Sequence, residues 1–418
     1  MNAVRRILDD SLYRNTIIML TASVLSNGFN YLYQLIMGRL LTPVQYGELL
    51  ALLSLFYMFS VAFTTINTSV TKFVNVYGIR GEFGVVRSLI VESTKRLFLT
   101  GALVVLLVAM ISPEVSKFLN IDNPWYLIVL FASVPFGLVL PVYQGALRGL
   151  QRFGALGLST SSWSLFKLVF SVLLVIAGHG VIGGVGGVFL AHVMAFALTL
   201  WLIADILKLD ERAKVPLREI LHYSGGAFIA LFAYTTLWNM DMIIVKHYLS
   251  PSEAGLYSSI SVLGKIALFA PGAIGMVIFP EASKIHERGE NPIKILIKGL
   301  LLAGVIAGGV VVVYALFPGT ILSIVYGGKY FDASPYLWRY ALAMMFLAMV
   351  SVILNYSLSI RNFRIGVALI ASLLVEIVVL ISKFHSTISN IITALIVVGV
   401  VTFITSLLSL ISRGRDDD

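Results

Sequence analysis

The sequence predicts an all-α integral membrane protein with about twelve transmembrane helices, arranged as two parallel six-helix repeats around a central cleft. Three observations predict it: apolar runs long enough to cross a bilayer, basic residues gathered between those runs, and motifs that recur in the two halves of the chain. Of the 418 residues, 58% are hydrophobic and 12% are charged, whereas roughly a quarter are charged in an average soluble chain. A soluble fold could not bury this much apolar surface.

Twelve apolar segments are each long enough to cross the membrane, since about 20 mostly apolar residues span its hydrocarbon core. Charged residues, prolines and glycines bound these segments. A basic stretch precedes the first segment without a cleavage pattern, so we expect the first span to be retained. The predicted spans cover residues 15–38, 47–75, 96–112, 125–147, 153–178, 181–207, 220–245, 254–280, 294–317, 332–358, 363–383 and 387–411.

The distribution of Lys and Arg predicts which side of the membrane each connection faces. With a cytoplasmic N-terminus, 22 of the 30 Lys and Arg residues fall in cytoplasmic segments and six in external ones. Short basic loops resist translocation, so this bias predicts a protein of the cytoplasmic membrane with an even number of spans and both termini inside. Topology therefore explains the net charge of +9, and we expect no nucleic-acid partner.

Two motifs recur at equivalent places in the two halves of the chain. Residues 41–47 (L-T-P-V-Q-Y-G) and 249–255 (L-S-P-S-E-A-G) share L-[ST]-P-x-x-x-G, while R-F-G at 152–154 matches R-I-G at 364–366. Six spans is an even number, so both halves would enter the membrane from the same side. The predicted domains are an N-terminal six-helix bundle (1–207), a cytoplasmic linker (208–219) and a C-terminal six-helix bundle (220–418).

Four segments together resemble the polysaccharide transport, or O-antigen flippase-like, branch of the multidrug/oligosaccharidyl-lipid/polysaccharide exporter superfamily. They are G-R-L-L-T-P-V-Q-Y-G (38–47), Y-Q-G-A-L-R-G-L-Q-R-F-G (143–154), L-S-P-S-E-A-G-L-Y (249–257) and F-P-E-A-S-K (279–284). The resemblance implies a transporter that flips lipid-linked oligosaccharide, a polysaccharide precursor, across the cytoplasmic membrane by alternating access. Its partners would be the lipid-linked glycan and membrane lipids, with coupling to Na⁺ or H⁺ left open, and we expect a functional monomer.

Polar side chains follow one face of each of the first two spans. Such a stripe gains nothing from facing lipid, so it faces another helix or a wet cavity. Hydrogen bonding between helices explains the stripes as well as a cavity does, and the family resemblance favours the cavity. The stripes are Ser23, Asn27, Asn30 and Gln34 in the first span and Thr64, Thr68, Lys72 and Asn75 in the second. The candidate substrate-binding residues among them are Asn27, Asn30, Gln34, Thr68 and Lys72.

Two lysines fall inside predicted spans. Lys265 lies near the middle of the eighth span and Lys167 in the fifth, each with serines on the same helix face. A buried ammonium costs on the order of several kcal/mol unless it is paired or hydrated. The diphosphate-linked lipid that the resemblance implies carries the anion that would neutralise it. We predict that Lys265 and Lys167 bind substrate, although structural ion pairing or snorkelling explains either lysine.

Two carboxylates in predicted spans are candidates for gating or for binding a coupling cation. Asp241 lies near the outer end of the seventh span and Glu376 inside the eleventh. Asp241 has an ordinary alternative, which is pairing with Lys246 or Arg39 at the outer surface. Its depth differs from that of Lys265 by roughly 10 Å at 1.5 Å per residue, so we expect no direct contact between them. Glu376 would need a partner or a proton.

No catalytic site is predicted. The six histidines show no metal-site spacing, there is no P-loop, and cysteine is absent. We therefore expect no cofactor, no metal and no catalytic residue, and a transporter rather than an enzyme. Two other functions stay open. One is a cation-coupled multidrug or small-molecule antiporter of the same superfamily, with Asp241 or Glu376 as the coupling carboxylate. The other is a membrane glycan polymerase, which the short outer connections disfavour.

Overall fold

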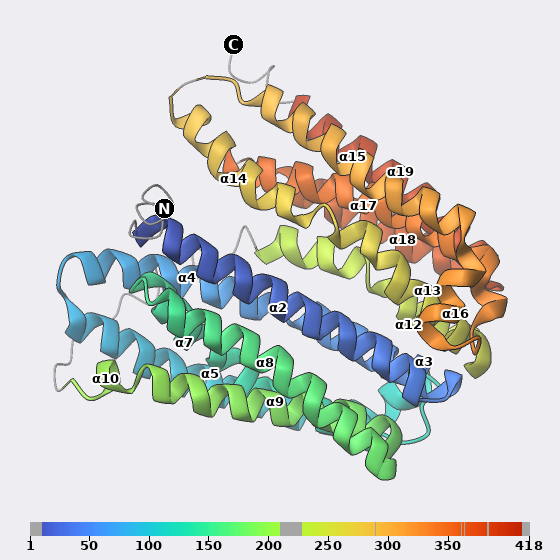
Figure 1. Ribbon diagram of the computed structural model, residues 1–418, viewed down its shortest axis with the longest axis horizontal. Helices are drawn as coiled ribbons and strands as arrows, with labels where there is room; N and C mark the ends of the chain where they lie inside the picture. Colours follow the sequence, from blue (N-terminus) through green and yellow to red (C-terminus); the bar gives the residue numbers. More distant parts are fainter. Residues whose placement is uncertain are drawn as a thin grey trace, which may run out of the picture. The chain divides into compact units, whose positions relative to one another are not determined.

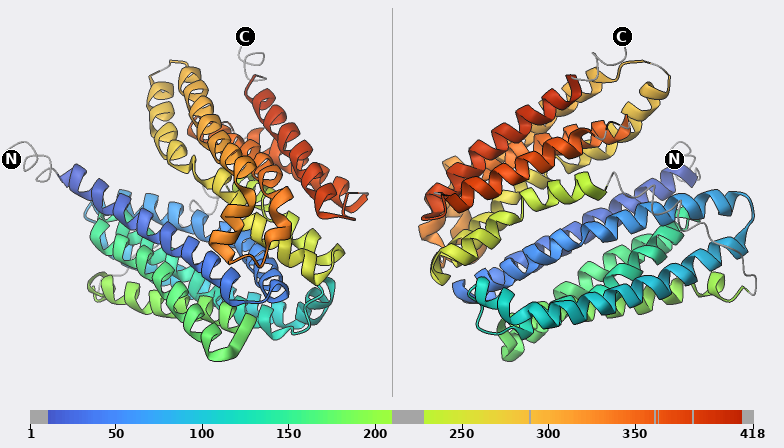
Figure 2. Two further views of the ribbon diagram at one scale, coloured as in Figure 1. Left: turned by 45° about the vertical axis from the view of Figure 1, so that its right-hand side comes forward. Right: turned by 180° about the vertical axis from the view of Figure 1, so that it is seen from behind.

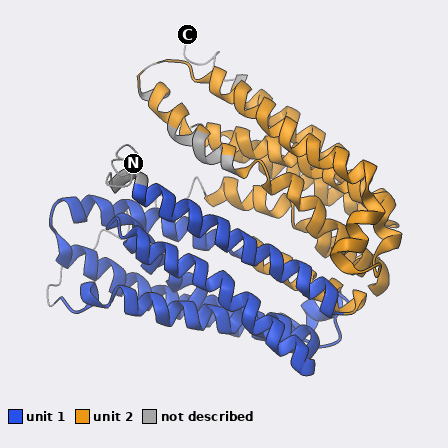
Figure 3. Ribbon diagram, viewed as in Figure 1, with its two compact units in different colours: residues 1–41, 59–225 blue, residues 42–58, 226–418 orange. Residues whose placement is uncertain are grey.

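The protein is helical throughout the part that the computed structural model describes, which is residues 11–209, 228–288, 290–360, 362, 364–382 and 384–411 (Figure 1 and Figure 2). A helix satisfies its backbone hydrogen bonds internally, as a chain in lipid must. The helices form two compact units (Figure 3). Unit 1 contains residues 1–41 and 59–225, and unit 2 contains residues 42–58 and 226–418. The predicted linker lies outside the described residues beyond Leu209.

Unit 1 has a core of aliphatic and aromatic side chains between its helices. Val74, Leu89 and Val139 are fully buried there. The helices of unit 1 are α2 (Ser11–Leu40), α4 (Val61–Ile79), α5 (Phe83–Phe118), α6 (Trp125–Phe131), α7 (Val134–Gly149), α8 (Phe153–Leu174), α9 (Gly180–Leu202) and α10 (Ala204–Leu207).

A reversal at Gly178 and Gly180 makes α8 and α9 neighbours. Both glycines have positive φ angles, 92° and 50°, which residues with a side chain rarely adopt. After the reversal the two helices pack closely, because a Cβ added to Gly187 would lie 2.1 Å from Ser171 Oγ and 2.3 Å from its backbone nitrogen. Small residues commonly permit such close packing between membrane helices.

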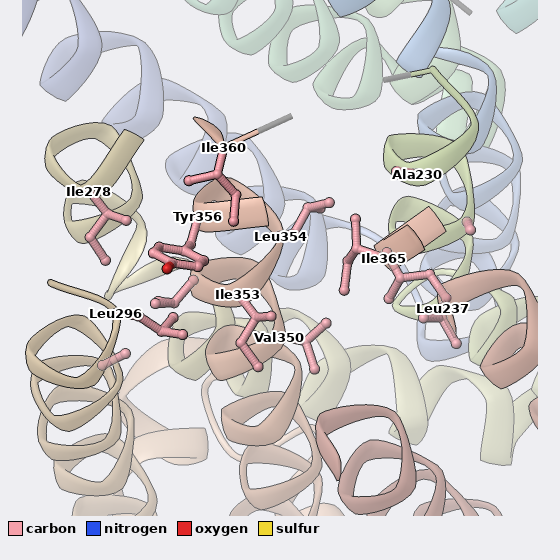
Figure 4. Close-up of a cluster of buried hydrophobic side chains, with 14 of the residues drawn as sticks. Ala230, Leu237, Ile278, Leu296, Val350, Ile353, Leu354, Tyr356, Ile360 and Ile365 are labelled. Carbon is pink, nitrogen blue, oxygen red and sulfur yellow. The ribbon is translucent and has the colours of Figure 1, made fainter. Parts of the chain in front are cut away.

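Unit 2 is built around α17, with a core that includes Ile278, Leu296 and Ile353 (Figure 4). Proline breaks one long helix, since α13 ends before Pro271 and α14 begins after it. The helices of unit 2 are α3 (Pro43–Phe59), Phe228–Leu237, α12 (Met240–Tyr248), α13 (Pro251–Phe269), α14 (Gly272–Glu287), α15 (Ile293–Leu316), α16 (Pro318–Tyr326), α17 (Ser334–Ser359), α18 (Arg364–Ser382) and α19 (Ile388–Ile411).

The repeated motif L-[ST]-P-x-x-x-G is a helix-start signal in both copies. Before α13, Ser250 and Glu253 form a capping box. Before α3, the backbone nitrogen of Thr42 donates to Gln45 Oε1 at 3.2 Å, and the nitrogen of Gln45 donates to Thr42 Oγ1 at 3.3 Å, which is the same reciprocal arrangement. In each copy proline occupies the first helical position, where no backbone donor is needed.

The glycines that end the two motifs bring α3 and α13 together within unit 2. A Cβ on Gly47 would lie 3.2 Å from the backbone of Ala254, and a Cβ on Gly255 would lie 2.3 Å from the carbonyl oxygen of Pro43. The first half of the second predicted span thus packs in unit 2, whereas its continuation, α4, belongs to unit 1.

Eight helical segments of the described chain are long and apolar enough to cross a membrane, and a ninth is added if Phe228–Leu237 and α12 form one span bent by 40°. One of the eight, Phe153–Leu202, reverses into α8 and α9 and so supplies two crossings. The predicted fold class, an all-helical integral membrane protein, is confirmed. The number of twelve spans fits these helices and stays a prediction.

Neighbouring glycines in α9 should respond differently to the same substitution. Gly187→Ala places a Cβ against the Ser171 backbone, so we expect a loss of about 1–3 kcal/mol in the free energy of unfolding. Gly186→Ala meets its nearest atom, Leu174 Cδ1, at 3.6 Å and should change stability by no more than about 0.5 kcal/mol. Thermal unfolding of the two variants in detergent measures the difference, and equal stability would contradict the close packing of α8 on α9.

Candidate functional site

An acidic site lies inside unit 2 and consists of Asp241, Glu376, Tyr257 and Tyr340. Asp241 is fully buried in the first turn of α12. Its Oδ2 accepts hydrogen bonds from the hydroxyls of Tyr257 in α13 and Tyr340 in α17, each at 2.7 Å. The Tyr340 hydroxyl also lies 3.1 Å from Ser261 Oγ. Three helices therefore hold one carboxylate.

The local backbone explains why a carboxylate is accommodated at this position. The helix Phe228–Leu237 ends at Trp238 and Asn239, and α12 then begins in a direction 40° away. The first turn of a helix carries backbone N–H groups without intrahelical partners and the positive end of the helix dipole. A negative charge is therefore less costly at Asp241 than it would be in the middle of an unbroken helix.

Glu376 of α18 supplies the second carboxylate of the acidic site. It is fully buried, and neither of its carboxyl oxygens has a hydrogen-bond partner among the described residues. Oδ1 of Asp241 also has no hydrogen-bond partner among these residues. The charges of Asp241 and Glu376 are close enough to interact. Buried carboxylates without donors need a proton or a cation. No cluster of three or more His, Cys, Asp or Glu residues occurs in the described ranges.

Lys265 of α13 lies near the acidic site without joining it. Its Nζ lies 5.2 Å from the centre of the Trp238 ring. No ion pair joins Lys265 to Asp241 within 4 Å, yet the two charges interact electrostatically. The described hydrogen bonds of Asp241 come from two tyrosines, and the sequence-based alternative, in which Asp241 pairs with Lys246 or Arg39, stays a prediction.

A basic site lies inside unit 1 and consists of Lys167, Tyr33, Trp163 and His192. Lys167 of α8 is only 2% exposed. Its Nζ lies 4.5 Å from the ring centre of Tyr33 and 5.0 Å from that of Trp163. The edge-on contact between Trp163 and His192, with ring centres 5.3 Å apart, completes the cluster. The structure thus places the two predicted substrate lysines in different units.

The two polar stripes make mostly local contacts. In α2, Asn27 is exposed and its amide lies 3.5 Å from Ser23 Oγ, while Asn30 and Gln34 are partly exposed. In α4, the Thr68 hydroxyl donates to the Thr64 carbonyl of its own helix at 3.0 Å. Lys72 is exposed, with its Nζ 5.7 Å from the ring centre of Phe73. The role of these residues in binding substrate stays a prediction.

Sequence reasoning missed the aromatic residues of both sites. Tyr257 ends the motif L-S-P-S-E-A-G-L-Y, but Tyr340 had no sequence signal that linked it to Asp241. Trp163 precedes Lys167 by four residues, a spacing that places both on one helix face and could have predicted a cation–π contact. Tyr33 and His192 come from other helices and could be found only from the fold.

The recurring R-F-G motif has a structural role in unit 1. Arg152, just before α8, forms a two-pronged ion pair with Asp205 of α10, in which Nη1 lies 2.9 Å from Oδ1. This hydrogen bonding holds the pKa of Asp205 below its ordinary value. The guanidinium of Arg152 suits this role because it can bond both carboxylate oxygens at once.

The fold is shared with membrane transporters of known structure. It is similar to that of a multidrug resistance MATE family transporter of the MOP superfamily in an inward-facing conformation, with a TM-score of 0.73 and 12% sequence identity over 96% of this chain and 99% of that one. It is also similar to the lipid II flippase MurJ in an inward closed conformation, with a TM-score of 0.71 and 16% identity over 94% of this chain and 87% of that one. At these identities the likeness concerns the fold alone.

Residues 12–286 match the family described as polysaccharide biosynthesis protein, and the chain belongs to that family. Its relatives include the probable flippase AglR of Haloferax volcanii, 27% identical over 308 residues, 68% of this chain and 61% of the relative. A putative O-antigen transporter of Shigella flexneri is 21% identical over 48% of this chain and 49% of the relative. The chain thus matches about half to three fifths of the length of these two relatives. The predicted family resemblance is confirmed.

The two carboxylates of the acidic site should respond oppositely to removal of their charge. Glu376→Gln removes a buried charge without breaking a hydrogen bond, so the melting temperature should stay equal or rise. Asp241→Leu leaves two buried tyrosine hydroxyls without their acceptor, so we expect a loss of about 1–3 kcal/mol. Thermal unfolding in detergent tests both variants, and equal destabilisation would contradict this description of the site.

Proposed function

We propose that the protein flips lipid-linked oligosaccharide, a polysaccharide precursor, across the cytoplasmic membrane by alternating access. The observation that carries the proposal is the match to a polysaccharide biosynthesis family whose relatives include a probable flippase and a putative O-antigen transporter. The positive-inside bias supports a location in the cytoplasmic membrane with both termini inside. Each unit has its own core, which supports a functional monomer.

Lys265 is the residue that we assign first to the anionic part of the substrate. Lipid-linked oligosaccharides carry phosphate next to the lipid, and a partly buried ammonium attracts phosphate strongly in a medium of low dielectric constant. The described part of the chain gives Lys265 no ion pair. Its one electrostatic neighbour of opposite charge is Asp241. The further substrate contacts we assign are those predicted from the sequence in α2 and α4: Lys72, Asn27, Asn30, Gln34 and Thr68. Lys167, the other predicted contact, is only 2% exposed and is not among them.

The acidic site is the place where an ion gradient would couple to transport. Three carboxyl oxygens of Asp241 and Glu376 have no hydrogen-bond donor among the described residues, and a proton or a Na⁺ ion would supply the missing partner. Neutralising Asp241 in this way removes its attraction for Lys265, which leaves the ammonium available to a phosphate. Cation binding and substrate binding are thereby linked, as reciprocal coupling requires.

A cation-coupled antiporter of drugs or small molecules is the second candidate function. It is supported by the likeness of the fold to that of a MATE transporter and by the same acidic site. In that function Lys265 would have no phosphate to bind, so the two candidates differ in their need for this residue. The relatives described above and the acidic and basic sites do not favour a membrane glycan polymerase.

Transport of a phosphate-linked lipid tests the assignment of Lys265. In liposomes containing a fluorescent diphosphate-linked lipid oligosaccharide, the wild-type protein should accelerate its crossing, and Lys265→Met should reduce the rate about tenfold or more, because the phosphate loses its counter-charge. Lys298→Met removes an exposed lysine of the same unit and serves as the matched control. Full transport by well-folded Lys265→Met would exclude this role, and efflux of cationic drugs without lipid transport would favour the antiporter.

Gradient dependence tests the acidic site. With a Na⁺ or H⁺ gradient imposed across the liposome membrane, transport by the wild type should rise, and Asp241→Asn and Glu376→Gln should abolish that rise while leaving the protein folded. Imposing each gradient separately identifies the ion. Glu114→Gln, which changes an exposed carboxylate of α5, is the control. A gradient response that both site variants retain would remove Asp241 and Glu376 from the coupling mechanism.

A further inference from the structure

The basic site of unit 1 holds a lysine that its own helices cannot neutralise. The side chains around Lys167 come from α2, α8 and α9, and the sequences of these three helices contain no aspartate and no glutamate. Among the described residues Lys167 makes no hydrogen bond and no ion pair, and its contacts are with the rings of Tyr33 and Trp163. The faces of two aromatic rings stabilise the charged ammonium, but they do not replace a counter-charge.

A second donor of the basic site also lacks a partner. The indole nitrogen of Trp163 is buried and donates no hydrogen bond within the described part of the chain. The hydroxyls on the same face of α8 are already used, because Ser171 donates to the Gly184 carbonyl at 3.0 Å and Ser164 donates to the Ser161 carbonyl at 3.0 Å. The donors left over are therefore the ammonium of Lys167 and the indole N–H of Trp163.

Contacts within unit 1 hold the aromatic rings of the basic site in position. The Tyr33 hydroxyl donates to the Gly184 carbonyl at 3.3 Å, the same oxygen that accepts from Ser171. The His192 Nδ1 lies 2.9 Å from the Val188 carbonyl, which can only accept, so Nδ1 carries a hydrogen and the ring is held against Trp163. The positions of the rings are thus set before any ligand arrives.

The internal repeat places the basic site where unit 2 has its acidic site. Eight residues before Leu41 of the first motif is Tyr33, and eight residues before Leu249 of the second is Asp241. Twelve residues after Arg152 is Ser164, and twelve after Arg364 is Glu376. Lys167 lies one turn after Ser164 on the same face of α8. Tyr33 and Ser164 are themselves uncharged, but the positive charge of Lys167 lies within one turn of the position that corresponds to Glu376.

We propose that the basic site binds a small inorganic anion such as chloride, held by the Lys167 ammonium and the Trp163 indole N–H. A cation and an N–H donor attract anions, and the 2% exposure of Lys167 favours a single dehydrated ion over a phosphate attached to a lipid and a glycan. The protein then has a cation site in one unit and an anion site in the other. This inference does not depend on the transported substrate.

Thermal unfolding in matched salts tests the proposal without a transport assay. Purified protein in detergent is compared in potassium chloride and potassium gluconate at equal ionic strength. Chloride should raise the melting temperature of the wild type by roughly 2–4 °C at saturation, since a ligand that binds only the folded state stabilises it. Lys167→Met should abolish the shift, and Trp163→Phe, which keeps a ring but removes the N–H, should weaken it. Lys265→Met, the matched lysine of unit 2, should keep it.

The stability of Lys167→Met separates ligand binding from a packing role. In gluconate this variant should melt at the same temperature as the wild type or higher, because an unneutralised charge has been removed. The absence of a chloride shift in the wild type, or an equal shift in Lys167→Met, would overturn the proposal. A Lys167-dependent shift produced by a diphosphate-linked lipid but not by chloride would also overturn it, and would return Lys167 to the substrate.

Discussion

A charge inside a membrane must be neutralised, and the rest of this structure depends on that constraint. Most of its Lys and Arg residues escape the cost by lying outside the predicted membrane spans. Among the charges inside the predicted spans, those of Asp241 and Lys167 are both buried but have very different surroundings. Tyrosine hydroxyls partly satisfy Asp241, whereas only aromatic rings contact Lys167. Both the acidic site and the basic site keep buried polar atoms that have no hydrogen-bond partner among the described residues.

Different kinds of residue bring the helices together in the two units. In unit 1, serine and glycine bring α8 and α9 into close contact, and Ser171 bonds directly to the backbone of Gly184. In unit 2, tyrosines from separate helices converge on one carboxylate. The two halves thus share the way these helices begin, with Thr42 and Ser250 as the capping residues. The charged side chains inside the two units differ.

Sequence reasoning could predict the fold class and most of the helices, because hydropathy and charge are local properties of a segment. It also found both carboxylates and both lysines, since any charge within an apolar run is conspicuous. It could not predict that the charges of Asp241 and Glu376 would be close enough to interact, because the two residues come from helices far apart in the chain. Nor could it find Tyr340 as a partner of Asp241, since that contact depends on how the helices pack.

The assignment of α3 to unit 2 has a practical consequence for anyone dividing this protein into halves. The chain passes between the units three times, near residues 41, 58 and 225, so the two compact units are not the two halves of the gene. A fragment ending at the linker would retain α3 but lose α13, the helix against which Gly47 packs. Isolated halves would each be missing a native packing partner, and recovering the folded protein from two fragments requires that they be produced together.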